Sequence, residues 1–150
     1  MTGKIVAVNI SVRKGEQKVP VPTGELRENH GLVGDAHAGD WHRQVSLLAE
    51  ESIDKMRRLG LDVDAGAFAE NLTTLGLDLP ALPVGTRLEI GEALLEVTQI
   101  GKECHTRCNI FYQAGDCVMP KEGIFARVLR GGTVAAGAPV RVLEDVVVES

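Results

Sequence analysis

The sequence predicts a mostly β protein of the α+β class, a small mixed or antiparallel β-barrel with two or three peripheral helices. Short segments of alternating apolar and polar residues outnumber the amphipathic helical segments. These strands do not alternate regularly with helices, as a parallel βαβ sheet would require. A chain of 150 residues with 44% hydrophobic residues suits one domain with one core, which we expect to cover residues 1–150.

The first part of the chain predicts a strand, an edge segment and a long loop. Apolar residues occupy every second position at the end of Lys4–Val12, which is strand periodicity. Val19–Pro22 suits a sheet edge, because each proline fixes φ and lacks an amide donor. Residues 24–43 are rich in Gly, His and Asp and predict a long irregular loop. Long loops in compact domains are often functional.

A short strand and a helix are expected next. Val45–Leu48 has the apolar character of a buried strand. The helix is expected from about Glu50 to Leu59, with its apolar residues on one face. Acidic residues in its first turn and basic residues near its end suit the helix dipole, and Gly60 is a suitable stop.

The following region predicts a strand and a hairpin. Leu72–Leu75 reads as a short strand. Thr86–Ile90 and Ala93–Gln99 are alternating segments separated only by Gly91-Glu92. A Gly-X pair between two strands predicts a tight hairpin turn of type II′.

The last part of the chain predicts a second helix and a final strand. The apolar residues of Gly123–Leu129 have helical spacing, and the pair Gly131-Gly132 would end that helix. Pro139–Val148 is rich in valine and strand-like.

Composition and charge exclude several classes of partner. Aromatic residues make up only 3% and the net charge is −5, so we expect no nucleic-acid partner. The chain starts without the apolar stretch of a signal peptide, and nothing in it is long and apolar enough to span a membrane. We therefore expect a cytoplasmic protein with no membrane partner.

The three cysteines, Cys104, Cys108 and Cys117, lie close together. An odd number in one short segment does not fit a disulfide framework. Three roles stay open for these cysteines: thiol chemistry, metal binding, and a structural role as small buried hydrophobic residues. Together with His105 the cysteines offer up to four metal ligands, although their spacing differs from that of a zinc ribbon.

Cys104 has the surroundings of a reactive thiol. Lys102, His105 and Arg107 are near it in sequence, and positive charge lowers the pKa of a thiol. Glu103 has the opposite effect. We therefore expect Cys104 to be the reactive cysteine, with His105 and Cys108 as further catalytic candidates.

Two further groups of residues are candidates for binding. His30, Asp35, His37 and His42 lie in the glycine-rich loop, where they could hold a metal, supply a base or satisfy the backbone. Of these, His37 is the best functional candidate. Residues 101–132 contain five basic and three acidic residues, a local charge of +2 in an acidic chain. Such a region suits a small anionic ligand.

Four stretches resemble, in their order along the chain, the MOSC family, which is named for the C-terminal domain of molybdenum cofactor sulfurases. They are Gly31–His37, Phe68–Thr73, Val97–Cys104 and Gly123–Leu129. The resemblance implies a MOSC-like β-barrel and a role with sulfur and the molybdenum cofactor, or molybdopterin. Cys108 and Cys117 go beyond a single-cysteine pattern and resemble a subgroup of small, stand-alone bacterial members.

The resemblance also implies roles for individual residues. Cys104 matches the family's characteristic cysteine, which would carry sulfur as a persulfide or coordinate molybdenum. Glu70 and Asn71 match a Glu-Asn-Leu stretch that would line the site. To these we add basic candidates and one histidine for the anionic pterin: Lys102, Arg107, Lys121, Arg127 and His37.

The function expected from these observations is that of a sulfur carrier in molybdenum cofactor maturation or binding, and any activity would be sulfurtransferase-like. Nothing in the chain resembles a pyridoxal-phosphate desulfurase, so a separate donor such as a cysteine desulfurase is an expected partner. Two alternatives stay open. One is a cofactor- or metal-binding module without turnover that uses Cys104, His105, Cys108 and Cys117. The other is a molybdenum-dependent reductase of N-hydroxylated compounds.

Overall fold

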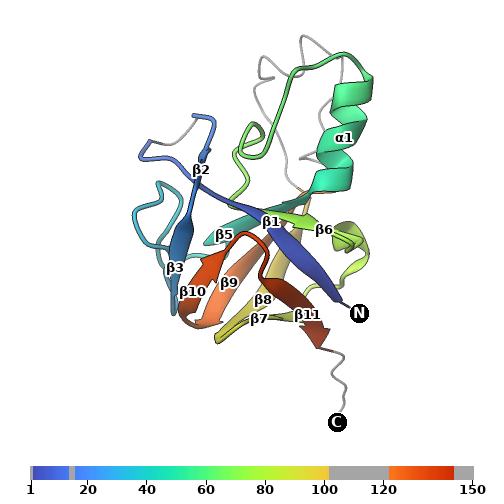
Figure 1. Ribbon diagram of the computed structural model, residues 1–150. Helices are drawn as coiled ribbons and strands as arrows, with labels where there is room; N and C mark the ends of the chain where they lie inside the picture. The colour runs from blue at the N-terminus through green and yellow to red at the C-terminus, as the bar shows by residue number, and fades with distance from the viewer. Residues whose placement is uncertain (1, 14–15, 102–121, 144–150) are drawn as a thin grey trace.

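A closed barrel of seven strands forms the centre of the protein. The computed structural model describes residues 2–13, 16–101 and 122–143 (Figure 1). The strands follow each other in the order β11-β7-β8-β9-β5-β6-β1, and pairing of β11 with β1 closes the barrel. The seven strands are β1 (Thr2–Ile10), β5 (Val45–Ala49), β6 (Leu72–Leu75), β7 (Arg87–Ile90), β8 (Ala93–Ile100), β9 (Ile124–Arg130) and β11 (Pro139–Leu143). Only β5 and β6 pair in parallel, so the expected mixed barrel is confirmed.

A smaller sheet packs against the barrel. It has the order β10-β3-β4 and consists of Gly132–Ala135, Thr23–Arg27 and Gly31–Leu32. Its side chains Leu26, Leu32 and Val134 belong to the barrel's core cluster. The prediction that residues 24–43 form one irregular loop was therefore wrong for the first part of the segment. The two strands there are too short to show a period in the sequence.

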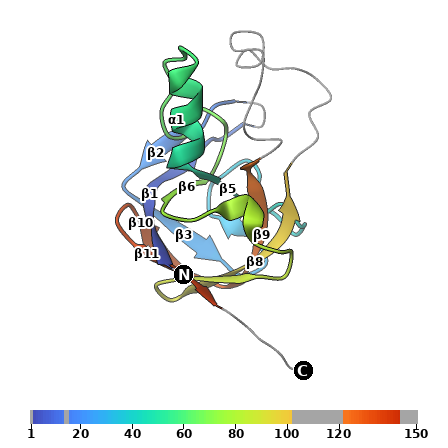
Figure 2. The ribbon, with the colours of Figure 1, turned by 90° about the vertical axis from the view of Figure 1, so that its right-hand side faces the viewer.

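The barrel interior is filled with aliphatic side chains from alternate strand positions, such as Leu88, Ile90 and Leu95, all fully buried. Each buried side chain of this size contributes about 1.5–3 kcal/mol relative to its exposed state. A second cluster lies outside the barrel, where Ile53 and Met56 of helix α1 (Glu50–Arg58) meet Phe125. Helix α1 rises from one end of the barrel in both views (Figure 1 and Figure 2).

The second expected helix, over Gly123–Leu129, is strand β9. Its residues Ile124, Ala126 and Val128 point into the barrel core. Phe125 points the other way but is also buried, because the α1 cluster covers it. Burial on both faces removed the alternation that would have identified a strand. In the described ranges, the two or three expected helices reduce to α1 and the short 3₁₀ turn Leu79–Ala81.

Other local predictions were confirmed. The β7–β8 turn pairs Ile90 with Ala93 and places Gly91 at φ 60°, as a two-residue type II′ turn requires. Strand β2 (Val19–Val21) pairs with β1 at the end of the sheet order, so the proline segment is an edge. The expected last strand is confirmed to Leu143, and its remainder, 144–148, lies outside the described residues. No helix in the described parts of the chain is long and apolar enough to cross a membrane.

Candidate functional site

Four residues form an ionic group that we call the lysine cluster: Ser11, Lys18 and Asp35, which are buried, and His37, which is half-buried. The Lys18 Nζ atom lies 2.8 Å from Asp35 Oδ1, 3.1 Å from Ser11 Oγ and 3.0 Å from His37 Nδ1. The side chains of Lys18 and Asp35 have no exposed surface. All three ammonium protons of Lys18 therefore have a partner within the protein.

Asp35 organises the loop around this lysine. Its carboxylate accepts hydrogen bonds from the backbone amides of Ser11 and His37, each at 3.0 Å. Burial raises the pKa of Asp35, but the hydrogen bonds from Lys18 and the two amides outweigh it, so the pKa lies below its usual value. Asp35 is consequently ionised and balances the charge of Lys18.

The backbone of Lys18 is held by the loop before β6. Its amide donates to the carbonyl of Gly66 at 2.8 Å. Gly66 has φ +90°, and a Cβ atom there would lie 2.1 Å from the Lys18 carbonyl oxygen. Only glycine allows this close approach, so the loop and the lysine cluster depend on each other.

Glu70 is a buried acid within the same loop. Its carboxylate accepts from the amides of Gly66 and Phe68 at 2.9 and 3.2 Å and from the Thr73 hydroxyl at 2.8 Å. Burial raises the pKa of Glu70 above its usual value, although these hydrogen bonds act in the opposite direction. The carboxylate thus has a structural role, and contact with a cofactor stays a prediction.

Asn71 connects three strands. Its Oδ1 accepts from the Ser46 amide at 2.9 Å, and its Nδ2 donates to the Asn9 carbonyl at 3.2 Å. The side chain is fully buried among these groups. As for Glu70, the expected contact with a cofactor is untested, while the role in joining β1, β5 and β6 is clear.

A second group, the glutamine cluster, lies at the end of β8 and contains His42, Arg43, Gln99 and Phe125. The Gln99 side-chain oxygen accepts from His42 Nε2 at 3.0 Å and from Arg43 Nε at 3.1 Å. The guanidinium carbon of Arg43 lies 5.1 Å from the centre of the Phe125 ring, a cation–π contact. Gln99 therefore orients two basic side chains at once.

Arg43 has no carboxylate partner among the residues that the structure describes. Within residues 2–13, 16–101 and 122–143, it is the one half-buried lysine or arginine without an ion pair. Arg57, the other half-buried arginine there, pairs with Glu50 at 2.6 Å. A guanidinium that is held by neutral groups retains terminal N–H donors for a ligand, and the geometry of these donors matches the oxygen atoms of a carboxylate or a phosphate.

The glutamine cluster lies next to Gly101, the last described residue before the segment 102–121, which contains the three cysteines. Gln99 Nε2 donates to the Gly101 carbonyl at 2.8 Å, and the Gly101 amide donates to the Gly123 carbonyl at 2.7 Å. The chain therefore leaves β8 and returns to β9 at one point. Seven predicted site residues lie outside the described residues: Lys102, Cys104, His105, Arg107, Cys108, Cys117 and Lys121.

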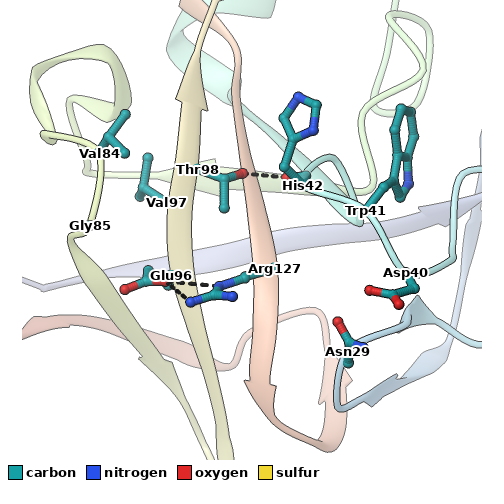
Figure 3. Close-up of a pocket in the computed structure, with 10 residues that line it drawn as sticks. All are labelled: Asn29, Asp40, Trp41, His42, Val84, Gly85, Glu96, Val97, Thr98 and Arg127. Carbon is teal, nitrogen blue, oxygen red and sulfur yellow. Dashed lines mark hydrogen bonds and ion pairs between the residues drawn. The ribbon is translucent and has the colours of Figure 1, made fainter.

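A pocket of about 450 Å³ lies between β8, β9 and the chain around Trp41 (Figure 3). Trp41 and Asp40 stand on one side and Val84 on the other, and Arg127 lies between them. The guanidinium of Arg127 pairs with Glu96, with Nη2 at 2.7 Å from the carboxylate. Its expected contact with an anionic cofactor is untested, and an anion would have to compete with Glu96.

Trp41 connects the lysine cluster with the glutamine cluster. Its indole N–H donates to the His37 carbonyl at 2.8 Å, and its ring meets the His42 ring edge-on at 5.8 Å. The His42 carbonyl accepts from the Thr98 hydroxyl of β8. Residues 37–42 thus form a strap from the lysine cluster to β8.

Of the four candidates in the glycine-rich loop, the structure brings Asp35 and His37 together and places His42 in the glutamine cluster. His30 accepts through its carbonyl from the Gly39 amide at 2.7 Å and so supports the loop backbone. The described part of the chain holds no group of three His, Cys, Asp or Glu side chains suited to a metal ion.

Lys18 and Arg43 were not among the site residues predicted from the sequence. Lys18 precedes an edge strand, where a lysine is normally exposed, and only its contact with Asp35 explains its burial. Arg43 lies two residues before β5, and its partner Gln99 is 56 residues away. The one local signal was the polar character of residues 24–43, which includes Arg43 but does not single it out.

Comparison with known proteins gives one family and several similar structures. The model of the MOSC domain family matches residues 33–141. The YuaD protein of Bacillus subtilis has a TM-score of 0.78 at 18% identity, over 93% of this chain and 94% of that chain. YiiM from Geobacillus stearothermophilus has a TM-score of 0.69 at 24% identity, over 95% and 75% of the two chains. YiiM from Escherichia coli has a TM-score of 0.66 at 24% identity, over 97% and 71%. At these identities the similarity shows the fold alone, and no curated protein matches the chain.

Proposed function

The chain belongs to the MOSC domain family, which is associated with molybdenum cofactor-related functions, and on this premise we propose that it carries sulfur for the cofactor. The carrier atom is the sulfur of Cys104. The donor is a separate protein that holds sulfane sulfur as a persulfide, such as a cysteine desulfurase. The acceptor is the molybdenum cofactor, held by the same domain.

The observation that carries this proposal is the environment of the Arg43 guanidinium. It is half-buried, oriented by Gln99 and Phe125, and has no carboxylate partner among the described residues. Gln99 lies at the end of β8, five residues before Cys104 in sequence. A positive charge near a cysteine favours the thiolate, which is the nucleophilic form. The same charge favours binding of an anionic ligand.

The described residues fit the anionic part of a pterin cofactor better than its metal. Arg43 offers the planar donors that a phosphate accepts. The described residues supply no cluster of metal ligands, and coordination of molybdenum by Cys104 is the alternative to a persulfide on the same sulfur. When bound, the cofactor would supply the metal that accepts the delivered sulfur. Further proposed contacts to the cofactor are Glu70, Asn71, Lys102, Arg107, Lys121, Arg127 and His37.

The transfer needs two exchanges at sulfur. The Cys104 thiolate attacks the outer sulfur of the donor's persulfide. The donor's S–S bond breaks, its cysteine leaves as a thiolate, and a new S–S bond forms on Cys104. Once the acceptor is bound, the Cys108 thiolate attacks the Cys104 Sγ atom, which forms a disulfide and releases the carried sulfur as hydrosulfide. A thiol reductant restores both cysteines, and His105 is the proposed proton carrier.

Intact-protein mass spectrometry tests this proposal. The wild type, Cys104→Ala and the control Cys117→Ala are incubated without oxygen with a cysteine desulfurase and cysteine. We expect a mass increase of one sulfur atom in the wild type and in Cys117→Ala, and none in Cys104→Ala. Full loading of Cys104→Ala would exclude Cys104 as the carrier.

The same samples separate the alternatives. Metal analysis that finds stoichiometric zinc or iron, lost in Cys108→Ala or Cys117→Ala, would favour a metal-binding module. Recovery of bound pterin together with reduction of an N-hydroxylated compound would favour a reductase. Persulfide on Cys104 without either result would favour the sulfur carrier.

A further inference from the structure

The contact between Lys18 and His37 determines where the histidine ring carries its proton. The ammonium nitrogen of Lys18 lies 3.0 Å from His37 Nδ1. An ammonium group has three donors and no acceptor, so Nδ1 must accept with its lone pair. The single ring proton of a neutral His37 is therefore on Nε2.

The surroundings of the two groups support this assignment. The ionised Asp35, 2.8 Å from Lys18 Nζ, keeps the lysine charged. Rotating the ring by 180° would put a C–H group against the ammonium and lose the hydrogen bond. A proton on Nδ1 would bring two N–H donors, and in the cationic ring two positive charges, into direct contact.

The position of the ring is fixed from both sides along the chain. The His37 amide donates to Asp35 Oδ2 at 3.0 Å, and the His37 carbonyl accepts from the Trp41 indole at 2.8 Å. The Lys18 ammonium is held by Ser11 and Asp35 as well. Lys18 cannot turn away without breaking its buried hydrogen bonds, and His37 would lose its part-buried bond to Lys18.

We propose that Lys18 is a positioning residue that fixes His37 as the neutral tautomer protonated on Nε2. In this state neither ring nitrogen offers a lone pair, because Lys18 occupies the one on Nδ1 and the proton occupies Nε2. His37 is then a hydrogen-bond donor at Nε2, and it does not ligate a metal. The importance of His37 for sulfur transfer rests on the proposed function, whereas its tautomer does not.

Nitrogen NMR of the full chain tests the tautomer directly. Long-range proton–nitrogen spectra distinguish Nε2–H, Nδ1–H and doubly protonated imidazole rings, and the variant His37→Gln identifies the signal. At neutral pH we expect wild-type His37 as the Nε2–H tautomer alone. A substantial Nδ1–H or doubly protonated population in the wild type would overturn the proposal, and this result needs no Lys18 variant.

Two variants then test the role of Lys18. Lys18→Met keeps an unbranched side chain as far as Cε and removes the ammonium group, but it leaves Asp35 buried without its partner, so the double variant Lys18→Met/Asp35→Asn is measured as well. In a folded variant we expect His37 to populate both neutral tautomers, whereas the control Lys4→Met keeps the wild-type spectrum. A pure Nε2–H ring in the folded double variant would overturn the role of Lys18.

Persulfide loading is measured on the same proteins. A wild type that shows the Nε2–H ring but takes up no sulfur would contradict the proposed function and leave the positioning role of Lys18 intact. A wild type that takes up sulfur but has a different tautomer would contradict the positioning role alone. The two failures are therefore distinguishable.

Discussion

The lysine cluster and the glutamine cluster each hold a basic side chain, but they treat its charge in opposite ways. Lys18 is fully buried and is balanced by Asp35 at 2.8 Å. Arg43 is half-buried, and its partners among the described residues are an amide oxygen and an aromatic ring. A balanced charge can only position its neighbours, whereas a charge with neutral partners retains attraction for an anion. We therefore infer that the charge of Lys18 positions its neighbours, His37 among them, and that the charge of Arg43 is the one that attracts an anion.

The strongest test of the comparison is Asp35→Asn, which leaves the Lys18 charge buried and unpaired. Removing one partner of a buried ion pair costs about 3–5 kcal/mol, so we expect a loss of that size in the free energy of unfolding. Urea denaturation measures it. The matched control is Glu96→Gln, which breaks the exposed pair with Arg127. Equal losses in the two variants would contradict the distinction between buried and surface charge.

The next test is Arg43→Gln, which should affect binding much more than stability. A hydrogen bond to a charged group contributes about 1.5–3 kcal/mol, so we expect affinity for inorganic phosphate to fall about tenfold to a hundredfold. Calorimetric titration with phosphate measures the affinity. Arg141→Gln is the control, because Arg141 already pairs with Glu89 at 2.5 Å. Unchanged phosphate affinity in Arg43→Gln would remove the glutamine cluster as an anion site.

The two buried acids predict opposite pH dependences of stability. The pKa of Asp35 is lowered by folding, so its stabilisation is present above its unfolded pKa of about 3.9 and is lost as the pH falls through the lower folded value. The pKa of Glu70 is raised, so its ionisation reduces stability as the pH rises from about 4.3 through the folded value.

Unfolding free energies measured across this pH range separate the two acids. Asp35→Asn should reduce the loss of unfolding free energy that occurs as the pH falls below about 3.9. Glu70→Gln should reduce the decline in unfolding free energy that occurs as the pH rises above about 4.3. The slope is the readout, because both substitutions also lower stability at every pH. A wild-type slope in either variant would show that the corresponding acid does not cause it.

The smallest effect is expected for Arg127→Gln. Its pair with Glu96 is exposed, and surface pairs contribute about 0–1 kcal/mol. Thermal unfolding should therefore change little. A loss of stability as large as that of Asp35→Asn would contradict this expectation and would mean that the Arg127–Glu96 pair beside the pocket in Figure 3 stabilises the barrel.

Sequence reasoning predicted the barrel because most of its strands have one buried and one exposed face. Strand β8 alternates clearly, with Leu95 and Val97 buried and their neighbours partly exposed. It failed at Phe125, where a helix far away in sequence covers the outer face of the strand. The same cause hid Lys18 and Arg43, whose partners lie 17 and 56 residues away. Periodicity reports local geometry, and these features depend on contacts that only the folded chain creates.

The hydrogen bond between the amide of Gly101 and the carbonyl of Gly123 has a consequence for engineering. Because this bond joins the ends of β8 and β9, the residues outside 102–121 are sufficient to pair all seven strands of the barrel. Replacing the stretch with a short turn should leave a folded scaffold, because the entropy cost of connecting two strand ends changes only slowly with the number of residues between them. New reactive sequences could then be grafted onto the same stem while the scaffold keeps its melting temperature.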